Sequence, residues 1–151
     1  MYSNFVAYCG LYCNLCERRI RIPEHAGQLL NSLMKAGYDE NTPGLAEFWR
    51  VLNTLAEMPL DKCCGNGKCG SPRCAIRKCA QSKEVALCPE CDEYPCEHIA
   101  ALGQSEPTLI HDCLRLRDIG VDAWAGEQEE RRLAGFCYAD IRCQCRTIPE
   151  E

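Results

Sequence analysis

Hydrophobic residues recur at helical spacing in two stretches of the N-terminal part of the chain. In residues 23–36 they fall on one face of a helix, and Gly37 is placed to end that helix. A second stretch opens with Thr42 as the helix cap and Pro43 at the first helical position, and it runs to Pro59. Its apolar side chains repeat every three or four residues: Leu45, Phe48, Trp49, Leu52, Leu55 and Ala56. The pattern therefore predicts two helices in this region.

Three more helical stretches follow in the C-terminal half of the chain. Pro95 predicts the start of a short helix that Gly103 ends. Ser105 is placed to cap a helix over residues 106–119, and a last helix is expected over 123–134. The charged residues of this last helix indicate an exposed face.

Residues 136–142 alternate weakly between polar and apolar and predict one short strand. The expected fold class is mainly α, or α+β with little strand: a small single domain of helices joined by cysteine-rich metal-binding knuckles. A chain of 151 residues is long enough for a real core, since a domain of this size buries about 68–70% of its unfolded surface. We expect one domain over residues 1–151, with a helical spacer (about 23–59), a cysteine-rich core (about 60–98) and C-terminal helices (about 105–135).

Cysteine changes this picture more than any other residue type, because the chain holds 15 of them. Three tight groups contain most of them: Cys9, Cys13 and Cys16; Cys63, Cys64, Cys69, Cys74 and Cys79; Cys88, Cys91 and Cys96. Such a density indicates either a disulfide framework in a small secreted protein or thiolate metal sites in an intracellular one. The N-terminus has no basic start and no long apolar run, so it does not look like a signal peptide. We therefore expect a cytoplasmic protein that binds metal through thiolates.

The first and third groups each resemble a metal knuckle. The first supplies three thiolates from one turn and needs a fourth ligand from elsewhere. In the third, Cys88 and Cys91 form the knuckle and Cys96 can close the site from the other side. His98 is a weaker closing ligand, because two residues along a helix turn its side chain roughly 200° away from Cys96.

The middle group has cysteines enough to lend ligands to both of its neighbours. Cys63 and Cys64 are adjacent, so their side chains diverge and only one of them is expected to serve a given ion. The three groups together predict two four-thiolate sites that hold zinc, with a further ion conceivable. A 4Fe-4S cluster is the alternative, because cysteine spacing alone does not separate the two kinds of site.

The remaining cysteines carry weaker signals. Cys113 lies in the apolar stripe of a predicted helix and is expected to be a small buried hydrophobic residue. The pair Cys143 and Cys145 either binds a metal ion weakly or has no metal role. The same two alternatives stay open for Cys137.

Two further pattern matches do not fit their context. Residues 65–70 satisfy the G-x-G-x-x-G dinucleotide fingerprint, but cysteines rather than a strand precede them and Pro72 follows at once. Cys9, Cys13 and Cys16 have the spacing that radical S-adenosylmethionine enzymes use for a 4Fe-4S cluster. Those enzymes surround the cluster with a barrel far longer than this chain, so we set that interpretation aside.

The charge pattern argues against nucleic acid as a partner. The formal net charge is −5, and thiolates that bind zinc would make it more negative. Nucleic-acid binding normally needs a basic surface that neutralises phosphates. Basic residues cluster only modestly here, at Arg18, Arg19, Arg21, Arg73, Arg77 and Lys78. No stretch approaches the roughly 20 apolar residues of a membrane span, so a membrane is not expected as a partner either.

An enzyme that uses a thiolate or a metal-bound water is a further alternative, with His25, His98 or His111 as its base. All three histidines lie on predicted helices, where a solvated histidine is the common outcome. A catalytic zinc keeps one open position, whereas four thiolates close the site. We therefore expect the metal to be structural.

Four segments carry a resemblance to a known family. Residues 9–16, 74–80, 88–97 and 135–142 resemble the motifs of the bacterial and archaeal family called domain of unknown function 3795. Residues 63–69 depart from the regular paired spacing of such motifs. The resemblance implies a zinc or iron-sulfur protein without an established activity. We accordingly expect a cytoplasmic metal-binding module that recognises a protein or another partner, and an iron-sulfur protein with a redox role is the alternative.

Overall fold

The computed structural model describes residues 2–58, 64 and 73–142. Within these ranges the chain forms six α-helices: α1 (Arg21–Lys35), α2 (Ala46–Ala56), α3 (Ala75–Ser82), α4 (Glu97–Gly103), α5 (Leu109–Ile119) and α6 (Val121–Leu133). Short 3-10 turns complete the described structure: η1 (Tyr2–Phe5), η2 (Cys13–Leu15), η3 (Cys88–Glu90) and η4 (Tyr138–Asp140). The prediction of a mainly helical fold is confirmed. None of the described helices combines the length and the apolar character that crossing a membrane requires.

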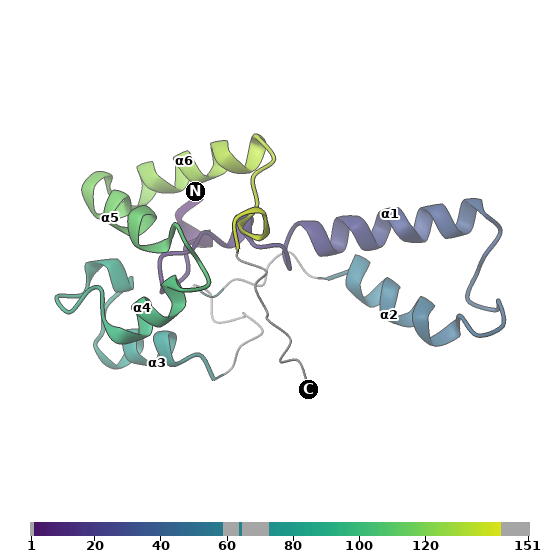
Figure 1. The fold of residues 1–151 in the computed structure, drawn as a ribbon, viewed down its shortest axis with the longest axis horizontal. Helices are drawn as coiled ribbons and strands as arrows, with labels where there is room; N and C mark the ends of the chain where they lie inside the picture. Colours follow the sequence, from purple (N-terminus) through teal and green to yellow (C-terminus); the bar gives the residue numbers. More distant parts are fainter. Residues whose placement is uncertain (1, 59–63, 65–72, 143–151) are drawn as a thin grey trace, which may run out of the picture.

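The first two helices form a hairpin that projects from the rest of the molecule (Figure 1). α1 starts two residues before Pro23, which lies in the first turn, where the missing N–H costs no helical hydrogen bond. Its end is the predicted one: Gly37 has φ +83°, and the N–H of Tyr38 donates to the carbonyl of Leu33 over 3.0 Å. That pattern is a glycine C-cap.

The predicted start of the second helix at Thr42 is wrong, because α2 begins at Ala46. The Thr42 hydroxyl instead accepts a hydrogen bond from the backbone N–H of Asp39 at 3.0 Å. Gly44, with φ +82°, then turns the chain before the helix begins. Thr42 thus closes the interhelical turn, which leaves it unable to cap the helix.

A similar local competition shifts the predicted start of α5. The Ser105 hydroxyl donates backward to the carbonyl of Leu102 over 3.1 Å, so Ser105 terminates α4, and α5 begins only at Leu109. The short helix expected from Pro95 begins at Glu97. The last helix begins at Val121, two residues before the predicted start.

Two segments differ in kind from the prediction. The strand expected over 136–142 is wrong, because Tyr138–Asp140 form the 3-10 turn η4 and no strand occurs in the described part of the chain. The Asp140 carboxylate accepts from the N–H of Cys137 at 2.9 Å and folds this turn back on itself. α3 was not predicted at all, although Ile76 and Ala80 have the i, i+4 spacing of a short buried face.

Two hydrophobic cores flank the N-terminal segment. Val6 belongs to the first core and Ala7 to the second, so consecutive residues of an extended segment point into opposite cores. The buried residues of the first core are Val6, Tyr12, Leu15, Leu87, Leu116, Trp124, Ala125 and Tyr138. Those of the second are Ala7, Cys9, Ala80, Cys88, Ile99, Leu109 and Cys113. The N-terminal segment is therefore the shared wall of both cores.

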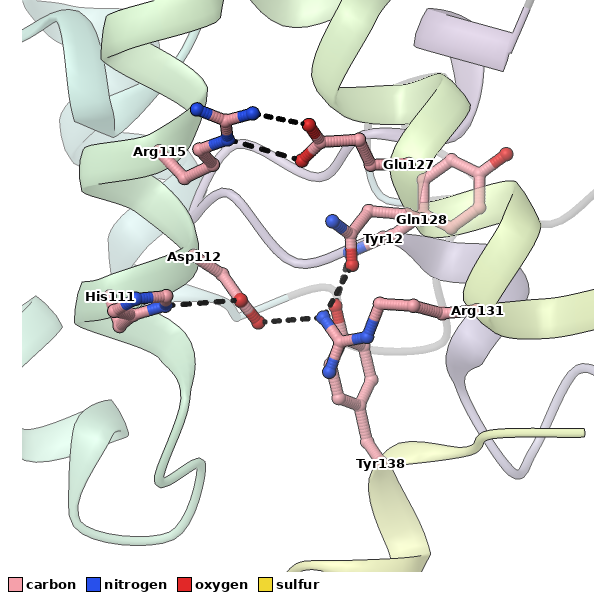
Figure 2. A network of polar contacts seen from close by, with 8 residues as sticks. All are labelled: Tyr12, His111, Asp112, Arg115, Glu127, Gln128, Arg131 and Tyr138. Atoms are coloured by element: carbon pink, nitrogen blue, oxygen red, sulfur yellow. Dashed lines mark hydrogen bonds and ion pairs between the residues drawn. The ribbon is translucent and has the colours of Figure 1, made fainter. Parts of the chain in front are cut away.

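A polar network fixes α5 against α6 beside the first core (Figure 2). Arg115 on α5 forms an ion pair with Glu127 on α6 at 2.6 Å. Arg131 on α6 donates to Asp112 at 3.2 Å and to Gln128 at 2.6 Å. The network sets the position of α5, which carries Cys113 into the second core.

We expect Trp124→Ala to lower the free energy of unfolding by about 3–5 kcal/mol, because a fully buried aromatic side chain leaves a cavity. Leu133→Ala on the same helix is the matched control: Leu133 is 73% exposed, and its loss should change stability by no more than about 0.5 kcal/mol. Urea unfolding followed by circular dichroism measures both. Equal effects of the two substitutions would contradict the assignment of the first core.

Candidate metal centre

Four cysteines from three neighbouring elements line one cavity of about 410 Å³. Cys79 comes from α3, Cys88 begins η3, Cys91 follows η3, and Cys96 immediately precedes α4. Ala80, Val85, Tyr94 and Ile99 supply most of the apolar wall. The predicted third group therefore lies together, and Cys79 of the middle group joins it.

The turn around Cys88 has the form of a knuckle. Pro89 occupies an early position of η3, where proline is compatible with the helical φ. The N–H of Cys91 donates to the carbonyl of Cys88 at 3.0 Å, and the N–H of Tyr94 donates to that of Cys91 at 3.0 Å. These successive turns bring Cys88 and Cys91 to the same side of the chain as Cys96.

The four thiols interact electrostatically. The pKa of Cys88 is raised to about 12, mostly by burial and then by neighbouring Cys96, Cys79 and Cys91 in that order. A cation placed between the sulfurs would reverse this effect, because it favours the thiolate form of every one of them. The donor set thus fits a soft metal ion in its chemistry.

One ion pair lies at the edge of this cavity. Lys83 and Glu93 both line it, and their charged atoms are 2.6 Å apart. Glu93 raises the pKa of Lys83 most, and Cys91 and Cys79 add to the rise, so the ammonium lies within electrostatic range of two of the four sulfurs. Sequence reasoning missed both residues, because neither has a motif that marks it.

The first cysteine group lies on a loop that runs along the wall between the two cores. An antiparallel bridge between Val6 and Tyr12 closes the loop at its base. The N–H of Cys16 donates to the carbonyl of Cys13 at 3.2 Å, and backbone N–H groups of Arg18 and Arg19 point at the Cys16 sulfur. Backbone donors aimed at sulfur are typical of a knuckle that holds thiolates.

The two loops contact each other directly. The N–H of Cys88 donates to the carbonyl of Tyr8 at 2.7 Å. Gly10, with φ +91°, passes so close to the second core that a Cβ there would lie 2.3 Å from the sulfur of Cys113 and 3.1 Å from Cγ of Pro89. Only glycine fits this position, for reasons of both conformation and space.

The structure also places the cysteines that the sequence left open. Cys113 is fully buried, as predicted, and its sulfur lies 3.4 Å from the carbonyl oxygen of Cys9. Cys137 is fully buried in front of η4. Cys74 is half-buried before α3 and does not line the four-cysteine cavity. Cys63, Cys69, Cys143, Cys145 and the glycine motif of residues 65–70 lie outside the described residues.

The histidines contribute little to the site. His98 borders the four-cysteine cavity but is largely exposed on α4. The His111 side chain is 87% exposed, and His25 is exposed on α1. Over residues 2–58, 64 and 73–142, no three His, Cys, Asp or Glu side chains already converge as metal ligands do. The four sulfurs therefore share a cavity without yet surrounding one point.

The family described as Protein of unknown function (DUF3795) matches residues 5–101, which is more than half of the chain. The chain belongs to this family. The predicted resemblance is confirmed, and the matched range of this DUF3795 protein includes all three cysteine groups. Neither the curated proteins nor the solved structures contain a match to it.

We expect Gly10→Ala to lower the free energy of unfolding of this DUF3795 protein by about 2–4 kcal/mol, because the new methyl group would overlap the Cys113 sulfur at an unfavourable φ. Gly135→Ala is the matched control: it has φ +88° with nothing within 4 Å of the added Cβ, so it should cost only about 1–2 kcal/mol. Denaturant unfolding of both variants measures the difference.

A second substitution separates the two causes. Cys113→Ala removes the sulfur that the Gly10→Ala methyl group meets, so the double variant should lose less stability than the two single losses added together. Additive losses, or equal losses for Gly10→Ala and Gly135→Ala, would contradict the close approach of the loop to α5.

Proposed function

We propose that this chain is a cytoplasmic zinc protein in which thiolate sites hold the fold together and present a surface to a protein partner. The observation that supports the proposal most strongly is the shared cavity of Cys79, Cys88, Cys91 and Cys96. Thiolates are the ligands that structural zinc sites prefer, and four of them complete a tetrahedral site. All eleven cysteines in the described part of the chain are thiols rather than disulfides, which suits a reducing compartment.

The position of the four cysteines supports a structural role for the ion. They come from α3, η3 and the start of α4, so one ion would tie together three elements that follow one another around the second core. Two buried residues of the second core belong to this region: Cys88 is one of the proposed ligands, and Ala80 is next to Cys79, another of them. Ion binding would draw the four sulfurs inward, and the binding free energy would then contribute to folding.

A zinc site closed by four thiolates also argues against a catalytic role for the ion. Four thiolates leave zinc without an open position for water or substrate, so this ion is not the centre of a reaction. Its role is to fix the loops around it, which is how small zinc modules present a recognition surface. The chain's net charge of −5 favours a protein partner over nucleic acid.

We expect the purified protein, prepared without air and without a metal-affinity tag, to be colourless and to hold about two zinc ions per chain. Replacing Cys88 and Cys91 together by serine should remove one of these ions and lower the helix content, because the site contributes to folding. Elemental analysis and far-ultraviolet circular dichroism measure the two effects. Iron with matching sulfide and visible absorption would instead indicate an iron-sulfur protein with a redox role.

Two single substitutions give the matched control. Cys79→Ser should weaken zinc binding at this site, whereas Cys74→Ser, which alters a cysteine outside the cavity lining, should leave it unchanged. The proposal fails if the metal-free protein keeps its full helix content, or if the wild-type protein binds no metal at all.

A further inference from the structure

Most of the exposed large hydrophobic side chains in the described part of the chain lie on the α1–α2 hairpin. Five of the seven are found there: Leu29, Met34, Tyr38, Phe48 and Val51. Inside the hairpin, by contrast, α1 buries only Ala26 and α2 buries only Leu52. Such a concentration of exposed apolar side chains marks an interaction surface when they form one contiguous patch.

Helical spacing puts three of these side chains on one face of the hairpin. Because successive helical residues are turned by about 100°, Phe48 lies about 40° and Val51 about 100° from the buried Leu52, in the same sense. On α1, Leu29 lies about 60° from the buried Ala26. The two helices of a hairpin are antiparallel, so these rotations bring Leu29, Phe48 and Val51 to the same face, which we call the apolar face.

The other polar and apolar side chains of the hairpin leave this face free of unpaired charge. Met34 is turned about 80° from Ala26 in the opposite sense, so it lies on the opposite face. The charged neighbours on α2 are Glu47 and Arg50, and they pair with each other at 2.5 Å. The apolar face therefore suits an apolar partner surface.

The size of the face suits a weak dimer. The 15 residues of α1 make it about 22 Å long, and two helices side by side are about 20 Å wide. The flat outline of the face is then roughly 400 Å², and projecting side chains make its accessible area larger. The smallest specific interfaces bury less than about 600 Å² on each partner.

The hairpin also has opposite charge at its two ends. The tip, residues 35–45, contains two carboxylates and one ammonium group, for a net charge of −1. At the base, Arg18 and Arg19 precede α1 and outweigh Glu57, which follows α2. In an antiparallel pair of hairpins each acidic tip would lie beside the basic base of the other. A second copy of the chain therefore complements this surface in charge as well as in apolar character.

We propose that the apolar faces of two chains pack together, so that α1 and α2 of both form an antiparallel four-helix bundle and the protein is a homodimer. A two-fold axis makes such a contact self-complementary, because the same patch serves on both chains. Figure 1 shows the hairpin standing away from α3–α6, which leaves room for a second hairpin beside it. Neither α1 nor α2 contains a cysteine, so the dimer does not depend on the zinc-binding function proposed above.

Analytical ultracentrifugation of the full chain tests the dimer. With rising concentration the wild-type protein should reach twice the single-chain mass of 17.0 kDa, with a dissociation constant of about 1–100 µM. Val51→Glu and, separately, Leu29→Glu should raise that constant at least about a hundredfold, because each puts two unpaired carboxylates into the interface. Met34→Glu is the matched control: Met34 is 62% exposed on the opposite face, so the constant should not change. Circular dichroism checks that every variant is folded.

A charge exchange tests the antiparallel arrangement. Arg18→Glu and Glu40→Arg should each weaken the dimer by about two- to fivefold at low salt, whereas the double variant should regain the wild-type dissociation constant. A double variant as weak as the two single changes combined would overturn this arrangement.

Two further outcomes would overturn the dimer itself or its location. A wild-type protein that stays at the single-chain mass at every concentration would show that the face does not bind a second copy. If that monomer still holds zinc, the proposed zinc function stands. Equal weakening by Met34→Glu and Val51→Glu would show that the dimer forms through another surface.

Discussion

The close contact between the N-terminal loop and the knuckle at Cys88 is the constraint on which the rest of the structure depends. The hydrogen bond from the N–H of Cys88 to the carbonyl of Tyr8 joins two cysteine groups that are far apart in the sequence. Gly10 then lies against both Pro89 and Cys113, so the loop, the knuckle and α5 meet at one point. Since Val6 and Ala7 point into opposite cores, a shift of this loop would disturb both of them.

This arrangement explains why cysteine occupies positions where other small domains have aliphatic residues. Cys9, Cys88 and Cys113 are among the buried residues of the second core. A thiol in such a place packs as a small hydrophobic group, and burial raises its pKa, as it does for Cys88. A soft ion bound to Cys88 would favour the thiolate form and so offset the cost of burying that charge. The second core is therefore the part of the fold whose stability should depend on metal, whereas the first core, around Trp124, is packed by ordinary large side chains.

The sequence predicted most of the helices because their apolar spacing is long and regular, and it predicted the burial of Cys113 from its place in such a stripe. Their starts were harder to predict, because Thr42 and Ser105 have the side chains of helix caps but bond backward into the preceding turn. α3 was missed because its eight residues are too few for a clear period. Two features depend on how distant segments pack: Cys79 rather than Cys74 lines the four-cysteine cavity, and Gly10 lies against Cys113. No local pattern encodes either of them.

The net charge of the chain bears on how thiolate sites could form in it. Two four-thiolate zinc sites would take the net charge of the chain from −5 to about −9, because each site carries about −2. Surface acidity alone would make such sites harder to form. However, Lys83 lies within range of the sulfurs of Cys91 and Cys79, and Arg142 lies within range of that of Cys16. Both cations already have carboxylate partners, Lys83 with Glu93 and Arg142 with Glu106. These ion pairs hold each cation near a cysteine group before metal binds. Metal binding therefore requires no further ordering of these two side chains.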